Sequence, residues 1–247
     1  MAERRFVVEG PQAVREALSA GALLELFYEP GRYDELVLAA GEAGTPVTAV
    51  TASVLAAMSD TVTPQGLIGV ASLIDVDLGS VPQPRLVAVL EAVNDPGNAG
   101  TVIRSADAAG ADAVVLTAGS VDPHNPKCVR ATAGSLWHLP VVSGAELEPV
   151  VRRLREADVQ VLATSGAGRE DLDQLERDGG LAGPTAWLFG PEASGLSDDA
   201  IALADRVVRI PMRGRAESLN LSAAAAVCLF ASARVHRESY ASRHAQP

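Results

Sequence analysis

Three loops of this sequence combine glycine or proline with side chains that can bind a ligand. They have the sequences NDPGNAG, GPEASGLS and MRGRAE, at residues 94–100, 190–197 and 212–217. Amide, guanidinium, carboxylate and hydroxyl groups occur in these loops or just after them: Asn98, Arg104, Glu192, Ser218 and Asn220. Glycine-containing loops also let a ligand approach backbone N–H and C=O groups. The three loops therefore mark the candidate binding site.

Each of these residues also has an ordinary structural explanation. In the first loop, Asp95–Asn98 fits a type II turn with proline second and glycine third, and Asn98 alone would be a turn residue. Arg104 falls opposite the apolar stripe of a predicted helix, Thr101–Ala109, and it would pair weakly with Asp107 there. Considered separately, these explanations require no ligand.

The second and third loops have comparable explanations. Glu192 would be a solvated carboxylate, and Ser197 would cap the short helix that follows. A further helix is predicted to begin near Ser218, with Ser218 as its N-cap and Asn220 in its first turn. The run Ala223–Ala226 gives this helix a surface of small residues, which allows another backbone to pack closely against it.

A parallel α/β sheet is predicted to position the three loops. Continuous apolar runs are typical of strands buried on both faces of such a sheet, and they occur at residues 86–93, 114–117, 159–164, 186–189 and 207–210. Helical segments lie between them. Ligands of parallel sheets lie outside the carboxyl ends of the strands. Each of the three loops directly follows one of these runs, so we expect the site at this edge.

The first 75 residues predict a smaller α/β unit. Strands are expected at 6–8, 23–28, 46–50 and 66–73, and helices at 11–20, 33–44 and 52–58. This alternation is typical of an α/β layer. The segment 75–84 contains Gly79, Pro82 and Pro84 without any periodicity, which favours a linker. The predicted division is therefore a first domain at 1–75, a linker at 76–84 and a second domain at 85–247.

Composition restricts the class of protein. The chain has 247 residues, of which 48% are hydrophobic, but no apolar run long enough to span a membrane and no secretory signal. Cys128 and Cys228 lie far apart without metal-ligand spacing, so we expect buried thiols, a cytoplasmic protein and no metal site. The formal net charge of −11 disfavours a nucleic-acid partner that is held mainly through its phosphates. A net charge does not reveal a local basic face, however, so it does not exclude such a partner.

The three loops, taken together with their flanking residues, resemble the motifs of a known family. NDPGNAGTVIRSADAAGA, LFGPEASGLS and RIPMRGRAESLNLSAAAAV are similar, in order and spacing, to the three motifs of the SpoU (TrmH-like) RNA ribose 2′-O-methyltransferases of the SPOUT superfamily. FVVEGPQAVREAL and TPQGLIGV resemble the substrate-binding domain that often precedes them. The resemblance implies an α/β fold: a parallel-sheet SPOUT domain with a C-terminal trefoil knot, preceded by a small α/β RNA-binding domain.

The resemblance also implies a cofactor and roles for the polar residues. The cofactor would be S-adenosylmethionine, held at the knot by residues that match the family's motifs: Phe189, Gly190, Ile210, Met212, Ser218 and Leu219. The matching catalytic residues would be Arg104, Asn98, Glu192, Ser218 and Asn220. Arg104 would act on the ribose 2′-hydroxyl, either as the base or as the group that activates this hydroxyl. Asn98 would orient Arg104 or the ribose, and Glu192 would organise the site.

The partners implied by the resemblance are RNA and a second copy of the chain. Ribosomal RNA is favoured over transfer RNA because of the N-terminal domain, and the homodimer interface would lie beside the knot. Candidate RNA contacts are Arg4, Arg5, Lys127 and Arg130. The alternatives are a tRNA methyltransferase and an RNA-binding protein that has lost catalysis. A nucleotide-dependent oxidoreductase is disfavoured, since Gly166-Ala167-Gly168 lacks the further glycine of the dinucleotide motif.

Overall fold

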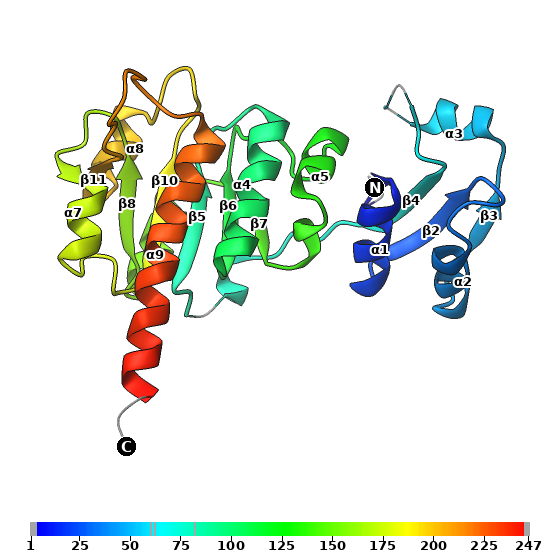
Figure 1. Cartoon of the computed structure of the whole chain (residues 1–247), viewed down its shortest axis with the longest axis horizontal. Coiled ribbons are helices and arrows are strands. Elements are labelled where there is room, and N and C mark those ends of the chain that lie inside the picture. Colours follow the sequence, from blue (N-terminus) through cyan, green and yellow to red (C-terminus); the bar gives the residue numbers. More distant parts are fainter. Residues whose placement is uncertain (1–3, 60, 62, 82, 245–247) are drawn as a thin grey trace.

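The computed structural model describes residues 4–59, 61, 63–81 and 83–244, which form two α/β units (Figure 1). The N-terminal unit is built on a sheet with the strand order β1-β4-β2-β3, in which only β2 and β3 are parallel. Its strands are β1 (Arg5–Glu9), β2 (Leu23–Tyr28), β3 (Val47–Ala49) and β4 (Leu67–Ser72). Its helices are α1 (Pro11–Ser19), α2 (Asp34–Glu42) and α3 (Ala52–Met58). The predicted alternation of strands and helices is present.

The larger unit contains a parallel sheet with the strand order β7-β6-β5-β10-β8-β11-β9. Its strands are β5 (Leu86–Leu90), β6 (Ala113–Thr117), β7 (Val141–Ala145), β8 (Gln160–Thr164), β9 (Glu170–Asp171), β10 (Thr185–Phe189) and β11 (Arg206–Arg209). The sequence predicted five of these strands. It missed β7 and β9, both of which lie at edges of the sheet, where strands are less buried and their apolar pattern is weaker.

Side chains of the central strands alternate between two hydrophobic cores. All five residues of β5 are buried, and so are all five of β10. Leu86, Ala88 and Leu90 belong to one core, whereas Val87 and Val89 belong to the other. Successive residues of a strand point to opposite faces of the sheet, so both faces must be covered by helices. This is why the central strands read as unbroken apolar runs.

Helices cover both faces of the larger sheet. The helices are α4 (Pro96–Ala109), α5 (Pro126–Thr132), α6 (Leu147–Glu156), α7 (Leu172–Arg177), α8 (Asp198–Ala202) and α9 (Leu221–His244), with short 3₁₀ turns at Leu78–Ser80 and Ser135–Trp137. Figure 1 shows α4 and α9 side by side in front of the sheet, and they pack on each other and on β5. Within the part of the chain that the structure describes, no helix is long and apolar enough to cross a membrane.

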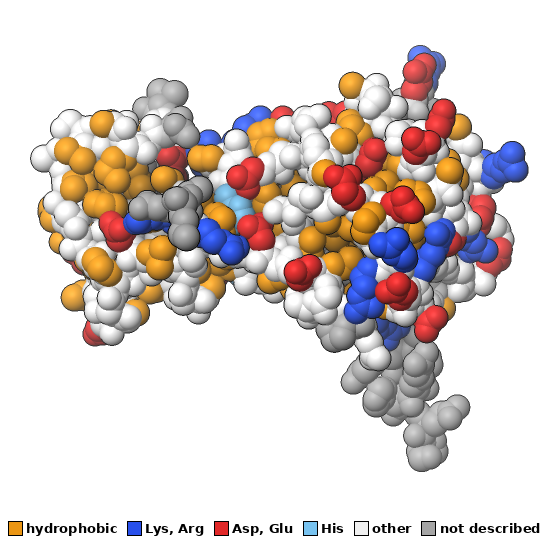
Figure 2. Space-filling view, turned by 180° about the vertical axis from the view of Figure 1, so that it is seen from behind, with side chains coloured by type: hydrophobic (Ala, Val, Ile, Leu, Met, Phe, Trp, Pro, Cys, Tyr) orange, Lys and Arg blue, Asp and Glu red, His pale blue; other side chains and the backbone are white. Residues whose placement is uncertain are grey.

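The first hydrophobic core continues from the larger sheet into the N-terminal unit. At the junction, the ring of Phe6 lies 4.7 Å from that of His124 and 6.2 Å from that of Trp137, measured between centroids. Helix α5 contacts β1 and lies between the larger sheet and the N-terminal unit in Figure 1. The two units therefore share buried apolar contacts. Figure 2 shows that the N-terminal unit also carries hydrophobic side chains on its surface.

The segment predicted to be a linker follows the edge of the larger sheet. Val76 N donates a hydrogen bond to Val141 O at 3.0 Å, and Asp75 forms an isolated bridge with the same residue. Leu78 is buried in the second core. These contacts attach the start of the segment to the sheet before β5 begins.

Candidate active site

Polar side chains from the three loops meet in one hydrogen-bond network at the carboxyl ends of the strands. Asn220 Nδ2 donates to Asn98 Oδ1 at 3.1 Å and also to Glu192 Oε1. Leu221 N donates to the same Glu192 oxygen at 3.1 Å. The fold thus brings together side chains that are 28 and 122 residues apart in sequence. Three of the five predicted catalytic residues belong to this network.

The loop after β5 enters α4 directly. The turn predicted for Asp95–Asn98 is wrong, because α4 begins at Pro96 and Asp95 is its N-cap. Asp95 Oδ1 accepts from Asn98 N at 2.8 Å, and Lys127 Nζ lies 3.2 Å from Asp95 Oδ2. The Asn98 N–H, and next the Lys127 ammonium, hold the pKa of Asp95 below its ordinary value. Proline is well suited to the first helical position, where its missing N–H has no intrahelical partner anyway.

Two hydroxyls, one from the last residue of β6 and one from the turn that follows it, hold the backbone of the same loop. β5 ends at Leu90, earlier than predicted, and Ala92 takes a positive φ of 50°. Ala92 N donates to Thr117 Oγ1 at 3.2 Å, and Val93 N donates to Ser120 Oγ at 3.2 Å. Neither hydroxyl residue is among the site residues predicted from the sequence. Serine and threonine commonly bond backbone groups, but nothing in the sequence shows that these two face another loop.

Helix α9 begins at Leu221, and its cap is Asn220 rather than the predicted Ser218. Asn220 Oδ1 accepts from Ser222 N at 2.9 Å and from Ala223 N at 3.3 Å, which is the contact of an N-cap residue. Glu192 is exposed, as the alternative explanation expects, but it also accepts hydrogen bonds from Asn220 Nδ2 and Leu221 N. A carboxylate at a helix N-terminus is stabilised by the unpaired N–H groups there. Ser197 caps α8, as predicted.

Arg104 lies on α4 but outside this network. Its side chain is exposed, and it makes no hydrogen bond or ion pair with any residue that the structure describes. The alternative pairing with Asp107 is not observed, because Asp107 Oδ2 instead lies 2.8 Å from His138 Nδ1. The predicted position opposite the apolar stripe is confirmed, since Val102 and Ile103 are buried. Arg104 is therefore available to an external ligand.

A pocket of about 460 Å³ lies beside the network. Its lining includes all six residues predicted to hold the cofactor: Phe189, Gly190, Ile210, Met212, Ser218 and Leu219. Gly190 is required by a close approach of backbones, since a Cβ there would clash with Gly195 and with the N atom of Leu196. The loop after β8 contributes Gly166 to the lining, and a Cβ there would meet no atom within 4 Å. Contact between these residues and a cofactor stays a prediction.

The residues predicted to contact RNA differ in their surroundings. Arg4 is exposed. Arg5 Nη1 lies 3.3 Å from Glu25, Lys127 is paired with Asp95, and Arg130 is paired with Glu9. On the face shown in Figure 2, basic side chains of the larger unit lie among acidic ones. These RNA contacts also stay predictions.

Neither cysteine has the surroundings of a reactive or metal-binding thiol. Cys128 and Cys228 are free and buried. Burial raises the pKa of Cys128 to about 12 and also raises the pKa of Cys228, so both thiols stay protonated at neutral pH. Among the described residues, no group of three or more His, Cys, Asp or Glu side chains is arranged to hold a metal ion.

The chain matches two family models. Residues 85–230 match the SpoU rRNA Methylase family, and residues 1–69 match the MRM3-like substrate binding domain. The chain is 35% identical over 185 residues to an uncharacterized tRNA/rRNA methyltransferase of Synechocystis, covering 75% of this chain and 66% of that protein. It is 34% identical over 230 residues to the 23S rRNA (guanosine(2553)-2′-O)-methyltransferase RlmP of Bacillus subtilis, covering 91% of this chain and 87% of that protein.

A solved structure has the same fold over nearly the whole chain. It is the rRNA methyltransferase of Sinorhizobium meliloti with bound AdoMet, which is 34% identical and superposes with a TM-score of 0.82. The superposition covers 94% of this chain and 87% of that one. The parallel α/β fold expected from the three motifs is confirmed. The chain therefore belongs to the SpoU rRNA methylase family.

Proposed function

We propose that this protein transfers a methyl group from S-adenosylmethionine to a ribose 2′-hydroxyl of 23S ribosomal RNA. The observation that carries the proposal is the network of Asn98, Glu192 and Asn220 beside a pocket at the carboxyl edge of the sheet. The family and the activity named for the Bacillus subtilis relative support the choice of reaction and of RNA.

The pocket beside the network fits S-adenosylmethionine in its chemistry. Met212 and Leu219, which are 36% and 37% exposed, would provide apolar surface for an adenine ring, and Phe189 also lines the pocket. Among the described residues of the lining, the acidic Glu192 and Glu217 outnumber the basic Arg209, and a nearby carboxylate favours a positively charged ligand. When bound, this cofactor would supply an electrophilic methyl group.

The described contacts divide the polar residues by role. Asn98, Glu192 and Asn220 hold the ends of α4 and α9 together, so they would position the loops around the ribose and the cofactor. Ser218 would shape the cofactor pocket. Arg104 is the residue left available for the 2′-hydroxyl. Because a guanidinium has a pKa above about 12, Arg104 is better suited to stabilise the oxygen as its proton leaves than to accept the proton.

The remaining architecture is proposed from the family and from exposed surface. The segment from β11 to α9 would thread a loop to complete the trefoil knot. Val227 and Phe230 of α9 are each 40% exposed, and Met212 is 36% exposed beside the pocket. A second copy of the chain covering these side chains would give the homodimer. We also propose that residues 1–75 bind the substrate, with Arg4 and Arg5 near RNA phosphates, and that Lys127 of the larger unit lies near a phosphate as well. The protein would act in the cytoplasm.

Mapping of ribose methylation across total RNA tests the proposal. Cells with and without this protein are compared, and one or more 2′-O-methyl groups in 23S rRNA should disappear without it and return with the wild-type gene. Loss of a methyl group from transfer RNA alone would reject the ribosomal substrate. An unchanged methylation map, in a protein that still binds RNA, would favour the alternative of an RNA-binding protein without catalysis.

A further inference from the structure

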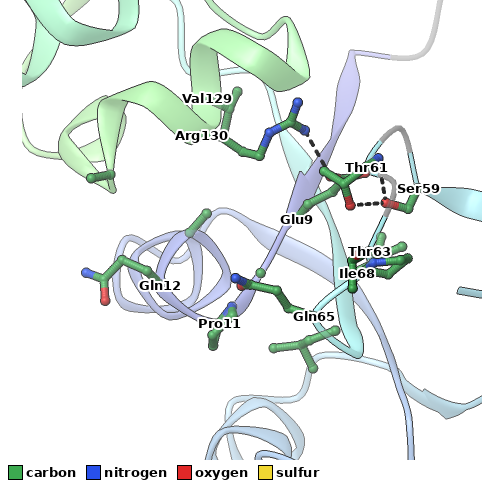
Figure 3. A pocket seen from close by; sticks show the side chains of 15 residues that line it. Glu9, Pro11, Gln12, Ser59, Thr61, Thr63, Gln65, Ile68, Val129 and Arg130 are labelled. Carbon is green, nitrogen blue, oxygen red and sulfur yellow. Dashed lines mark hydrogen bonds and ion pairs between the residues drawn. The ribbon is translucent and has the colours of Figure 1, made fainter. Parts of the chain in front are cut away.

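A second pocket, of about 460 Å³, lies where the N-terminal unit meets α5 (Figure 3). One side is formed by the end of β1, the start of α1 and the segment that leads into β4, and the other side is formed by α5. None of the residues proposed to hold the cofactor lines it. It is therefore separate from the pocket at the carboxyl edge of the larger sheet.

The guanidinium of Arg130 is held in place in this pocket by a carboxylate. Arg130 Nη1 donates to Glu9 Oε2 at 2.9 Å, and the side chain of Glu9 is only 7% exposed while that of Arg130 is 35% exposed. A buried carboxylate needs a partner, since leaving it unpaired is costly. The ion pair joins the two units and leaves part of the Arg130 side chain open to the pocket.

The other side chains of the pocket are uncharged. Glu9 and Arg130 are the only charged residues among the described residues that line it. Thr61, Thr63 and Gln65 provide hydroxyl and amide groups, and Pro11 and Val129 provide apolar surface. The Gln65 carboxamide lies against Gly10, where a Cβ would clash with its oxygen, and it makes no hydrogen bond with any described residue. The pocket thus offers hydrogen-bonding groups without net charge.

We propose that this pocket binds an unpaired nucleobase of the RNA substrate, stacked on the guanidinium of Arg130. Unpaired bases are recognised by stacking on aromatic or guanidinium planes and by hydrogen bonds to their edges. Glu9 fixes the guanidinium and offsets its charge, so Arg130 suits a flat, neutral base better than a phosphate. Gln65 and the threonine hydroxyls supply partners for the base edge. The inference rests on the proposed function, because it identifies a second place at which the same RNA is held.

The variant Arg130→Lys tests the stacking role. Lysine keeps a positive charge for Glu9 but has no planar group. We expect affinity for an unmodified in vitro transcript of 23S rRNA to fall roughly tenfold, the size of effect typical of one stacking contact. The slope of log affinity against log salt should stay unchanged, because the charge is retained. Affinity for S-adenosylmethionine should also stay unchanged. Arg152→Lys, at an exposed position on α6, is the matched control.

A second variant, Gln65→Ala, separates base binding from folding. Gln65 is exposed on a loop, so its replacement should leave the melting temperature unchanged while weakening rRNA binding several-fold. Binding of the transcript at wild-type strength by both variants would overturn the proposal while leaving the methyltransferase assignment intact. If Arg130→Lys unfolds the protein, Gln65→Ala decides alone. A wild-type protein that neither binds nor methylates the transcript would overturn the proposed function together with the pocket.

Discussion

The two pockets have the same volume, about 460 Å³, but they are held together in different ways. At the carboxyl edge of the larger sheet, the side chains of Asn98 and Asn220 and the carboxylate of Glu192 meet the N-terminus of α9. At the junction of the two units, the polar contacts between side chains include two ion pairs, Glu9 with Arg130 and Glu16 with His138.

The difference predicts different responses to solution conditions. The hydrogen bond between the side chains of Asn220 and Asn98 joins two neutral amides and therefore depends little on salt. Ion pairs between partly exposed side chains are screened by salt, and those that involve histidine also depend on pH. We therefore expect the candidate active site to keep its geometry over conditions in which the junction loosens. Four predictions test this contrast.

The largest effect is expected for Arg104→Ala, a substitution at the candidate active site. Arg104 is exposed and bonds to no described residue, so its loss should remove chemistry without disturbing the network. Methylation of 23S rRNA should fall roughly 10²–10⁴-fold, while calorimetry shows nearly unchanged affinity for S-adenosylmethionine. The melting temperature should not fall, because alanine is a strong helix former. Arg152→Ala on α6 is the control, and full activity of Arg104→Ala would reject the assigned role.

Glu192→Gln should have the next largest effect. The substitution keeps an acceptor but removes the charge at the N-terminus of α9, so stability should fall by about 0.5–1 kcal/mol. Methylation should fall roughly 10- to 100-fold, because a small displacement of the groups that position the substrate strongly lowers the reaction rate. Glu148→Gln removes a carboxylate from the first turn of α6 and should alter stability alone. Equal losses of activity in the two variants would show that Glu192 acts only on stability.

Much of the fold was predictable because buried parallel strands have a strong sequence pattern. β5 and β10 are fully buried and were predicted as continuous apolar runs. In contrast, β7 was missed because its last three residues, Ser143–Ala145, leave the buried interior. β7 lies at the edge and has only one neighbouring strand within the sheet. Because its last three residues are not buried, β7 lacks the continuous apolar run by which buried strands are predicted.

The candidate site was predictable as a set of loops but not as a geometry. Pro96-Gly97 is compatible with a type II turn and with the start of a helix, and the structure has the helix, whose Gly100 packs directly against the backbone of Cys128. The contact of Glu192 with the N-terminus of α9 depends on tertiary structure that no local pattern encodes. The same is true of Thr117, which supports a loop from another strand.

Thr117→Val tests that support with a smaller expected effect. Valine has nearly the same shape but cannot accept the hydrogen bond from Ala92 N, so a backbone N–H loses its partner at a cost of about 1–3 kcal/mol. The loop that leads to Asn98 should become less well positioned, and methylation should fall several-fold with little change in cofactor affinity. Thr185→Val removes a buried hydroxyl at the first residue of β10, which is the end of that strand away from the candidate active site. This control should lose stability without a comparable loss of activity per folded molecule.

The smallest effect is expected at the junction, from the titration of His138. The hydrogen bond to Asp107, and then the one to Glu16, raise the pKa of His138 above its ordinary value. A raised pKa in the folded state means that the stabilisation is complete below a pH of about 6.5 and is lost as pH rises through the folded pKa. Because the side chain is 42% exposed, His138→Gln should lower the melting temperature by only about 1 °C near pH 6, and by less near pH 9.

A matched histidine away from the junction should show the opposite pH dependence. Burial lowers the pKa of His236, whose Nε2 lies 3.0 Å from Gly183 O. Its neutral form is therefore favoured in the folded protein, and wild-type stability declines as pH falls through the ordinary value. The cost of His236→Gln should consequently be smaller near pH 6 than near pH 9. If both variants show the same pH dependence, His138 is not a pH-sensitive contact between the units, and the junction owes its stability to Glu9, Arg130 and the shared apolar core.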